Sequence, residues 1–171
     1  MNIVAIVQAR LGSKRLPNKV MKLINNVPMI EIVLKRLSKS KLVNNIVVAT
    51  SDDVEDIKLK KFINTLGYDC EQGSRDDVLN RYICVATKYN ADLIVRITGD
   101  CPLIDPELVD QVINKFTKDH VDYCSNISPA TFPDGLDVEV FTLESLKDSY
   151  AMTTNKIDLE HVTLYLRESG K

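Results

Sequence analysis

Near its start the chain reads Ile3-Val4-Ala5-Ile6-Val7-Gln8, followed at once by Ala9-Arg10-Leu11-Gly12-Ser13-Lys14-Arg15-Leu16-Pro17-Asn18-Lys19. The first segment is apolar and rich in β-branched residues, which is typical of a buried strand. The second is cationic and contains small residues. Small residues let the backbone approach a ligand closely, so that amide N–H groups and cations can bind phosphate oxygens together. The junction therefore predicts a phosphate site at the end of a strand.

The positive charge is concentrated at this end of the chain. Residues Met1 to Ile30 contain five Lys and Arg and no Asp or Glu, whereas the 171-residue chain has 22 Lys and Arg against 24 Asp and Glu. A net charge of -2 argues against general binding to nucleic acid or to a membrane surface. The cationic segment is thus interpreted as a local binding feature rather than as part of a generally basic surface.

Composition also limits which other classes of protein fit the sequence, such as membrane, secreted, disulfide-bonded and metal-binding proteins. The apolar runs are no longer than a strand, and the start lacks the pattern of a signal peptide, so we expect a cytoplasmic protein. Four cysteines without a C-x-x-C pair are expected to be reduced thiols. Two histidines leave little for a His/Cys metal site, although carboxylates could still hold a hard cation.

Apolar strand-like segments alternate with segments of helical period. This alternation predicts one domain over residues 1–171, of the α/β class, with a mostly parallel sheet between two helical layers. The expected strands are Ile3–Gln8, Ile46–Thr50, Leu93–Thr98, a short piece around Tyr123, and Val138–Phe141. Apolar stripes at i, i+3, i+4 and i+7 predict helices over Ile30–Leu37, Leu59–Leu66, Leu79–Ala86 and Val109–Phe116.

Helix boundaries carry their own signals. Pro28 and Pro106 suit the first turn of a helix, Asp105 suits an N-cap, and Gly67 suits a helix end. Ligands of parallel sheets bind at the carboxyl ends of the strands. Three polar segments follow strands in this way: Ala9–Lys19, Ser51–Asp53 and Gly99–Asp100.

In the cationic segment, Gly12 and Ser13 permit close backbone approach, Arg10 offers a planar fork for two oxygens, and Lys19 is a mobile point charge. The spacing matches neither the P-loop nor the dinucleotide fingerprint. The alternative interpretation is a solvated basic loop.

Acidic residues supply the remaining candidates. Asp100 follows a strand through Gly99, and one carboxylate with phosphate oxygens and waters is a usual way to hold Mg²⁺; the alternative is a loop aspartate that caps its own backbone. Alternation over Leu136–Val140 puts Asp137 and Glu139 on one strand face, where they are expected to meet water, a metal or a polyhydroxy ligand. A solvated edge strand is the alternative.

The cationic segment resembles the signature loop of the sugar-nucleotide cytidylyltransferases, which include acylneuraminate cytidylyltransferases, and within them it is most similar to the spore-coat polysaccharide (SpsF-like) branch. The chain looks short at its C-terminus for this family. Five further blocks match in order: Ala49–Asp53, Gly73–Tyr82, Arg96–Asp105, Pro133–Phe141 and Glu160–Thr163.

The resemblance implies a Rossmann-like fold of the nucleotide-diphospho-sugar transferase type, and roles for particular residues. Arg10, Lys19 and Asp100 would be catalytic, with Asp100 holding Mg²⁺. The other implied contacts to CTP are Ala9, Gly12, Ser13, Arg15, Thr50, Asp52, Gly73, Arg75 and Asp77. The implied sugar-side residues are Asp134, Asp137, Glu139 and His161.

Simpler alternatives stay open for several of these. Asp76 or Asp77 could cap the following helix, with Arg81 pairing back one turn. Ser51 could be a cap, and His161 could be a surface helix residue.

The implied reaction is Mg²⁺-dependent transfer of CMP from CTP to a sugar, with acidic sugars among the candidates, and release of pyrophosphate, in surface polysaccharide synthesis. A later strand with a second metal-binding Asp is not found, so Asp137 or a partner chain, such as a second copy in a homodimer, would have to replace it. The alternatives are a non-catalytic nucleotide-binding subunit and a glycosyltransferase, although the latter would favour a D-x-D motif that the sequence lacks.

Overall fold

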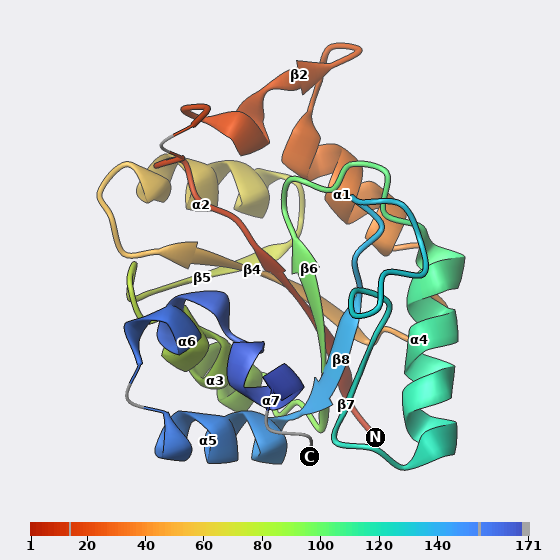
Figure 1. Cartoon of the computed structure of the whole chain (residues 1–171). Helices are drawn as coiled ribbons and strands as arrows, with labels where there is room; N and C mark the ends of the chain where they lie inside the picture. The colour runs from red at the N-terminus through yellow and green to blue at the C-terminus, as the bar shows by residue number, and fades with distance from the viewer. Residues whose placement is uncertain (14, 154, 169–171) are drawn as a thin grey trace.

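The computed structural model describes residues 1–13, 15–153 and 155–168 (Figure 1). At its centre is a six-stranded sheet in the order β5-β4-β1-β6-β8-β7. β1 pairs in parallel with β4 and β6, and β4 pairs in parallel with β5, whereas β8 is antiparallel to both of its neighbours. The strands are β1 (Ile3–Gln8), β4 (Asn45–Ser51), β5 (Asp69–Gly73), β6 (Leu93–Thr98), β7 (Tyr123–Ser125) and β8 (Glu139–Thr142).

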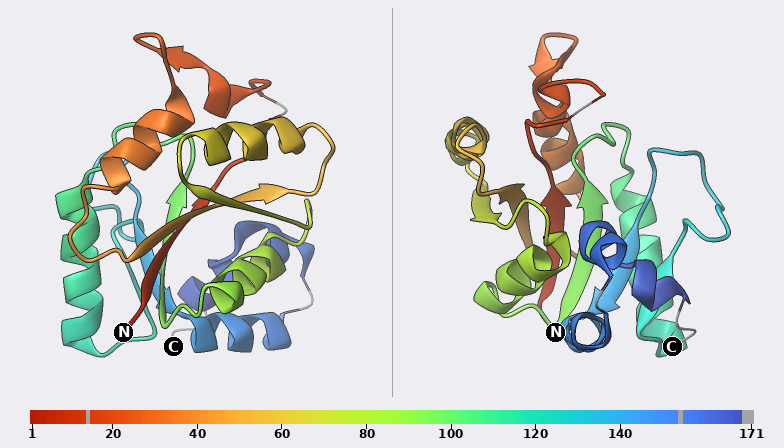
Figure 2. Two further views of the ribbon diagram at one scale, coloured as in Figure 1. Left: turned by 180° about the vertical axis from the view of Figure 1, so that it is seen from behind. Right: turned by 60° about the vertical axis from the view of Figure 1, so that its left-hand side comes forward.

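Helices cover both faces of the sheet, so the three-layer arrangement is confirmed (Figures 1 and 2). On one face lie α1 (Met29–Leu37), α2 (Asp56–Thr65) and α4 (Pro106–Asp119). On the other lie α3 (Val78–Lys88), α5 (Leu143–Met152), α6 (Lys156–His161) and α7 (Leu164–Glu168). A short 3-10 helix η1 (Lys19–Met21) and a hairpin of β2 (Leu23–Ile24) and β3 (Val27–Pro28) stand away from the sheet (Figure 2).

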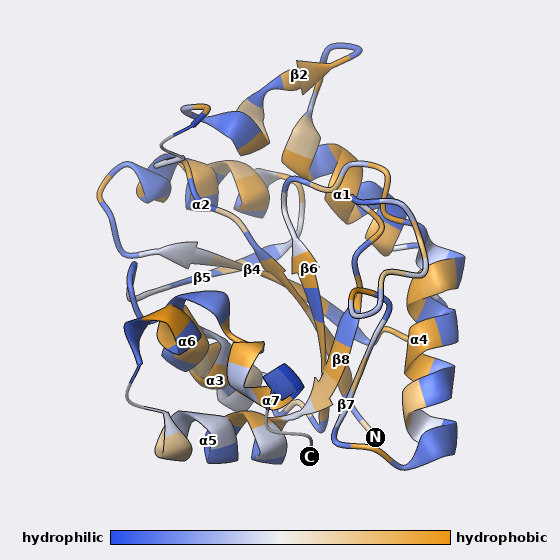
Figure 3. Ribbon diagram, viewed as in Figure 1, coloured by the Kyte–Doolittle hydropathy of each residue, from blue (hydrophilic) through white to orange (hydrophobic). Residues whose placement is uncertain are grey.

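The alternation of side chains along β1 explains why there is an apolar core on each face of the sheet. Ile3, Ala5 and Val7 point into one apolar cluster, and Val4 and Ile6 point into the other. A strand buried on both faces reads as a continuous apolar run, which is how this segment reads. The helices are apolar along one side only, as α4 shows in Figure 3.

Most sequence-based expectations about the fold are confirmed. β1 and β6 have the predicted bounds, and Asp105 caps α4 through bonds from the backbone N–H groups of Glu107 and Leu108. Gly67 follows α2 with a φ of 83°, as its helix-end role requires. Pro28 lies one residue before α1 rather than inside its first turn.

β5 was not predicted, because its sequence, Asp69-Cys70-Glu71-Gln72-Gly73, is mostly polar. None of the described helices is long and apolar enough to cross a membrane.

The register of the parallel strands brings their carboxyl ends to the same level. Gln8 at the end of β1 lies between Ala49 of β4 and Thr98 of β6. The three carboxyl ends therefore meet at one edge of the sheet, and the segments that follow them are brought together there.

Candidate active site

A cleft of about 370 Å³ opens at this edge of the sheet. Its cationic wall comes from the segment after β1, and its opposite wall comes from β6 and α6. The lining residues are Gln8, Ala9, Arg10, Ser13, Arg15, Lys19, Val20, Thr98, Asp100 and Glu160. The structure thus brings the predicted phosphate loop and the predicted metal-binding Asp100 together; Lys14 lies outside the described residues.

The loop is held in place by a buried carboxylate. The Oδ1 of Asp56 accepts a hydrogen bond of 2.7 Å from the backbone N–H of Leu11, and its Oδ2 accepts bonds from the backbone N–H and the hydroxyl of Ser51. Asp56 has no exposed surface. Sequence reasoning missed Asp56, although an acidic residue at the first position of a helix, next to a strand-end serine, is a usable signal.

Lys19 and Asp100 form an ion pair across the cleft, from the Nζ to the Oδ2. Partial burial alone would raise the pKa of the Asp100 carboxyl. The hydrogen bond and charge of Lys19, aided by a hydrogen bond from Thr98, outweigh burial and hold that pKa below its usual value. Asp100 is therefore a carboxylate at neutral pH.

Gly99 sets the distance between the two strand ends. Its N–H donates to the carbonyl of Gln8 at 2.8 Å, and a Cβ at this position would lie 2.9 Å from the Cβ of Ala9. Close approach of the two strand ends is what requires glycine here. The same closeness places Asp100 opposite the cationic loop.

A second cavity, also of about 370 Å³, adjoins the cleft and shares Arg10 and Glu160 with it. Its other lining residues are Ser74, Arg75, Asp76, Asp77, Lys156 and Leu159. Nη1 of Arg75 lies 3.2 Å from Oδ2 of Asp53, so the segments after β4 and β5 are joined at this point. The segment after β5, which includes the implied CTP contacts Arg75 and Asp77, therefore lies beside the phosphate loop.

Within this segment the helix-cap interpretation of Asp77 is confirmed. Its Oδ1 accepts from the backbone N–H of Asn80 at 2.9 Å, and its Oδ2 accepts from the Tyr150 hydroxyl at 3.0 Å. Arg81 does not pair back to it. Arg81 is almost fully buried, and its Nε and Nη1 have no partner in the described part of the chain. Gly73 makes room for it, because a Cβ there would lie 3.0 Å from the Cγ of Arg81.

The residues at the end of β4 lie beside the two cavities but do not line them. Thr50 is fully buried, with no hydrogen-bond partner for its hydroxyl among the residues described. The side chain of Asp52 is exposed, and its backbone N–H donates to the carbonyl of Gly73. Ser51 accepts from the N–H of Asp53 but does not cap a helix, because α2 begins at Asp56 and its N-cap is Glu55.

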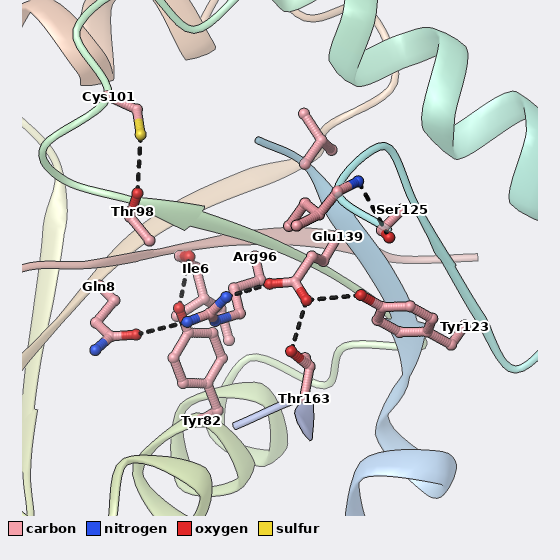
Figure 4. Close-up of polar contacts among 12 residues, drawn as sticks. Ile6, Gln8, Tyr82, Arg96, Thr98, Cys101, Tyr123, Ser125, Glu139 and Thr163 are labelled. Carbon is pink, nitrogen blue, oxygen red and sulfur yellow. Dashed lines mark hydrogen bonds and ion pairs between the residues drawn. The ribbon is translucent and has the colours of Figure 1, made fainter. Parts of the chain in front are cut away.

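The predicted exposure of Glu139 beside Asp137 is wrong. Glu139 is buried and pairs with Arg96, and it accepts hydrogen bonds from the hydroxyls of Tyr123 and Thr163 (Figure 4). The physical reason is that β8 is an interior strand and begins at Glu139. A carboxylate there must be paired inside the protein, whereas Asp137 precedes the strand and remains half-buried.

The pKa values around Glu139 follow from this pairing. Burial by itself would lower the pKa of Arg96, but the Glu139 carboxylate outweighs it and raises that pKa. Burial, followed by the charges of Asp134 and Glu139, raises the pKa of Asp137. Arg96 and Glu139 thus form a charged pair beneath the cleft.

Two other predicted sugar-side residues lie apart from the described cavities. Asp134 is exposed in the loop before β8, and His161 is exposed at the end of α6. Its neighbour Glu160 lines both cavities instead. Among the described residues, no group of three or more His, Cys, Asp or Glu is arranged to hold a metal ion.

Comparisons with known proteins agree with this geometry. The cytidylyltransferase family model matches residues 4–170. The spore coat polysaccharide biosynthesis protein SpsF of Bacillus subtilis is 32% identical over 180 residues, covering 97% of this chain and 70% of that protein. The 3-deoxy-manno-octulosonate cytidylyltransferase of Pelobacter propionicus is 35% identical over 121 residues, covering 70% and 46%.

A solved cytidylyltransferase structure from Leptospira borgpetersenii superposes with a TM-score of 0.95 at 34% identity, covering 99% of this chain and 72% of that one. The expected Rossmann-like nucleotidyltransferase fold is confirmed. Since the family model spans nearly the whole sequence, the chain belongs to the cytidylyltransferase family of enzymes.

Proposed function

We propose that this protein transfers CMP from CTP to a sugar, with Mg²⁺, and releases pyrophosphate. The observation that carries the proposal is the Lys19–Asp100 pair, which joins the cationic loop to the end of β6 in one cleft. An ionised carboxylate facing a cationic wall suits a ligand that brings both a phosphate chain and a metal ion.

The transfer is an attack by a sugar oxygen on the α-phosphorus. A bond forms between these two atoms, the bond from the α-phosphorus to the bridging oxygen breaks, and the electron pair leaves with pyrophosphate. The proton of the sugar hydroxyl passes to solvent. Arg10 and Lys19 then face a growing negative charge, with the loop amides beside them. Fixed cations and amides stabilise that charge more than they stabilise the ground state.

The residues present fit Mg²⁺ in its usual protein setting, where one carboxylate shares the ion with phosphate oxygens and waters. Asp100 would be that carboxylate, because it is ionised, partly exposed and in the cleft. When bound, the ion would neutralise phosphate charge during transfer.

The names of two relatives suggest the substrate and the context. The Pelobacter enzyme is named for an acidic sugar, and SpsF for spore coat polysaccharide. We therefore propose an acidic sugar as the first candidate substrate, in surface polysaccharide synthesis.

The four free cysteines support a reducing, cytoplasmic setting. We also propose that two copies associate through a sheet edge, which light scattering would test.

The test is pyrophosphate release from CTP with Mg²⁺ against a panel of acidic and neutral sugars. ATP, GTP and UTP run in parallel, and calorimetry measures the binding of each nucleotide to the same sample. CTP-selective release with an acidic sugar is expected. CTP binding without release from any sugar would contradict the proposal and favour a non-catalytic nucleotide-binding subunit.

A further inference from the structure

The block Glu160–Thr163 has no role in what has been described so far, although Glu160 lines both cavities. Arg10 and Glu160 are the residues that the two linings share, so they lie where the cleft passes into the adjoining cavity. Among the residues that the structure describes, none forms a hydrogen bond or ion pair with the Glu160 side chain. Its carboxylate can therefore accept hydrogen bonds from a ligand at this junction.

The end of α6, which carries Glu160, is held by an unusual backbone conformation. Val162 has a φ of 62° and a ψ of -59°, and the N–H of Thr163 donates to the carbonyl of His161 at 2.6 Å. This is a γ-turn of the rare, strained kind, and a positive φ is especially unfavourable for a β-branched residue such as valine. Strained turns persist only where the surrounding contacts impose them, and they gather at functional sites.

Two buried contacts impose this turn. Val162 has no exposed surface and packs into the apolar core on the α3 face of the sheet. Thr163 is 1% exposed, and its hydroxyl donates to the Oε1 of Glu139 on β8, which is itself paired with Arg96 (Figure 4). The end of α6 is thus fixed to the sheet, and Glu160, two residues before the turn, is kept at the junction of the two cavities.

The two cavities differ in the surface that they offer to a ligand. The cleft is mostly polar and contains Arg15 and Lys19, whereas the adjoining cavity is mostly apolar, with Leu159 of α6 in its wall. A nucleotide is divided in the same way, because its phosphates are charged and its base has two flat apolar faces. An acidic sugar is polar on every side. With the phosphates in the cleft, the base therefore suits the adjoining cavity, and the ribose that joins them would lie at Glu160.

We propose that Glu160 binds the ribose of the nucleotide, by accepting hydrogen bonds from the 2′ and 3′ hydroxyls at its two carboxylate oxygens. A carboxylate accepts hydrogen bonds and donates none, so it matches a pair of neighbouring hydroxyls and repels a phosphate. Acidic residues bind ribose hydroxyls in the same way in dinucleotide-binding folds. Thr163 is a positioning residue, because it touches Glu139 rather than the ligand. The inference rests on the proposed function, because it needs a nucleotide in the cleft.

The test compares the binding of CTP with that of 2′,3′-dideoxyCTP, which lacks both hydroxyls, by calorimetry with Mg²⁺ present. Removal of a negative charge beside the phosphates changes the affinity for both nucleotides, so the ratio of the two dissociation constants is the quantity to compare. We expect the unaltered chain to bind CTP at least about tenfold more tightly, because a charged acceptor makes strong hydrogen bonds. In Glu160→Ala the two affinities should agree within about twofold. Glu168→Ala makes the same change at an exposed position of α7 and should keep the ratio of the unaltered chain.

Two variants of Thr163 test the positioning role by the same ratio. Thr163→Val replaces the hydroxyl by a methyl group of similar size, so it releases the end of α6 from Glu139, and the preference for CTP should fall. Thr163→Ser keeps the hydroxyl and should restore the preference. A general loss of structure would weaken the binding of both nucleotides alike, so an unchanged ratio in Thr163→Val would overturn this role.

The outcomes for Glu160 separate this inference from the proposed function. An unchanged ratio in Glu160→Ala would overturn the assignment, and a simultaneous rise in the KM for the acceptor sugar would assign Glu160 to that sugar instead. Equal binding of CTP and 2′,3′-dideoxyCTP to the unaltered chain would overturn this inference alone. Binding of neither nucleotide would contradict the proposed function itself.

Discussion

The Nζ of Lys19 donates a hydrogen bond to the Oδ2 of Asp100, although 81 positions separate the two residues in the sequence. The lysine leaves the loop after β1, and the aspartate follows β6, which pairs with β1 in parallel. The fold thus sets opposite charges side by side at the edge where three strands end. Both groups are about one-third exposed, so an incoming ligand can reach them.

Removal of the lysine charge should abolish turnover but keep the fold. We expect Lys19→Ala to lower kcat/KM for CTP at least about 100-fold, since one fixed donor to a developing oxyanion is worth about 3 kcal/mol. Pyrophosphate release measures the loss, and circular dichroism checks the fold. The matched control is Lys22→Ala, because Lys22 directly follows η1 and its side chain is exposed. Unchanged activity in Lys19→Ala would remove the loop from the mechanism.

Asp100→Asn tests the metal ligand. The amide is isosteric but carries no charge, so it binds Mg²⁺ poorly. The expected result is a loss of activity, or a rate that no longer responds to Mg²⁺, in a titration of the ion at fixed CTP. Asp105→Asn, which keeps an acceptor for the α4 cap, should respond to Mg²⁺ as the unaltered chain does. A normal Mg²⁺ response in Asp100→Asn would rule out this role.

The pKa of Asp100 also predicts a pH dependence. Its pKa in the folded protein lies below the ordinary value of 3.8, chiefly because Lys19 outweighs the effect of burial. The pair therefore contributes to stability above pH 3.8, and the contribution disappears as the pH falls through the folded-state pKa. Urea unfolding of the unaltered chain and of Asp100→Asn should show a difference at neutral pH that narrows as the pH falls below 3.8. A difference that widens on acidification would contradict this pKa direction.

The contacts around the site show which features could be predicted from the sequence and which could not. Ile3–Gln8 predicted β1 correctly because a strand buried on both faces leaves an unbroken apolar run. Glu139 was misplaced because alternation identifies which residues share a face and says nothing of what covers that face. The partners that make its burial possible, Arg96 and Thr163, come from distant parts of the chain. The strand Asp69–Gly73 was missed for a related reason, since its pairing with β4 outweighs its polar composition.

Asp56 should be important for stability although it does not line the cleft. Asp56→Ala would leave the buried N–H groups of Leu11 and Ser51 without acceptors, at about 1–3 kcal/mol for each. We expect a fall of about 3 kcal/mol in the free energy of unfolding and weaker CTP binding, because the phosphate loop is anchored at Leu11. Urea unfolding and calorimetry measure the two effects. Asp148→Ala, exposed on α5, should change neither. Full stability in Asp56→Ala would show that the loop is anchored elsewhere.

The Arg96–Glu139 pair should be far more costly to break than an ion pair at the surface. Glu139→Gln removes the charge that compensates an arginine whose side chain is 16% exposed, so we expect a loss of about 3 kcal/mol in the free energy of unfolding. Glu71→Gln makes the same change in the pair with Lys88, whose side chain is 60% exposed, and should cost less than about 1 kcal/mol. Urea unfolding of both variants at neutral pH makes the comparison. Equal losses would mean that Glu139 is no better shielded from water than Glu71.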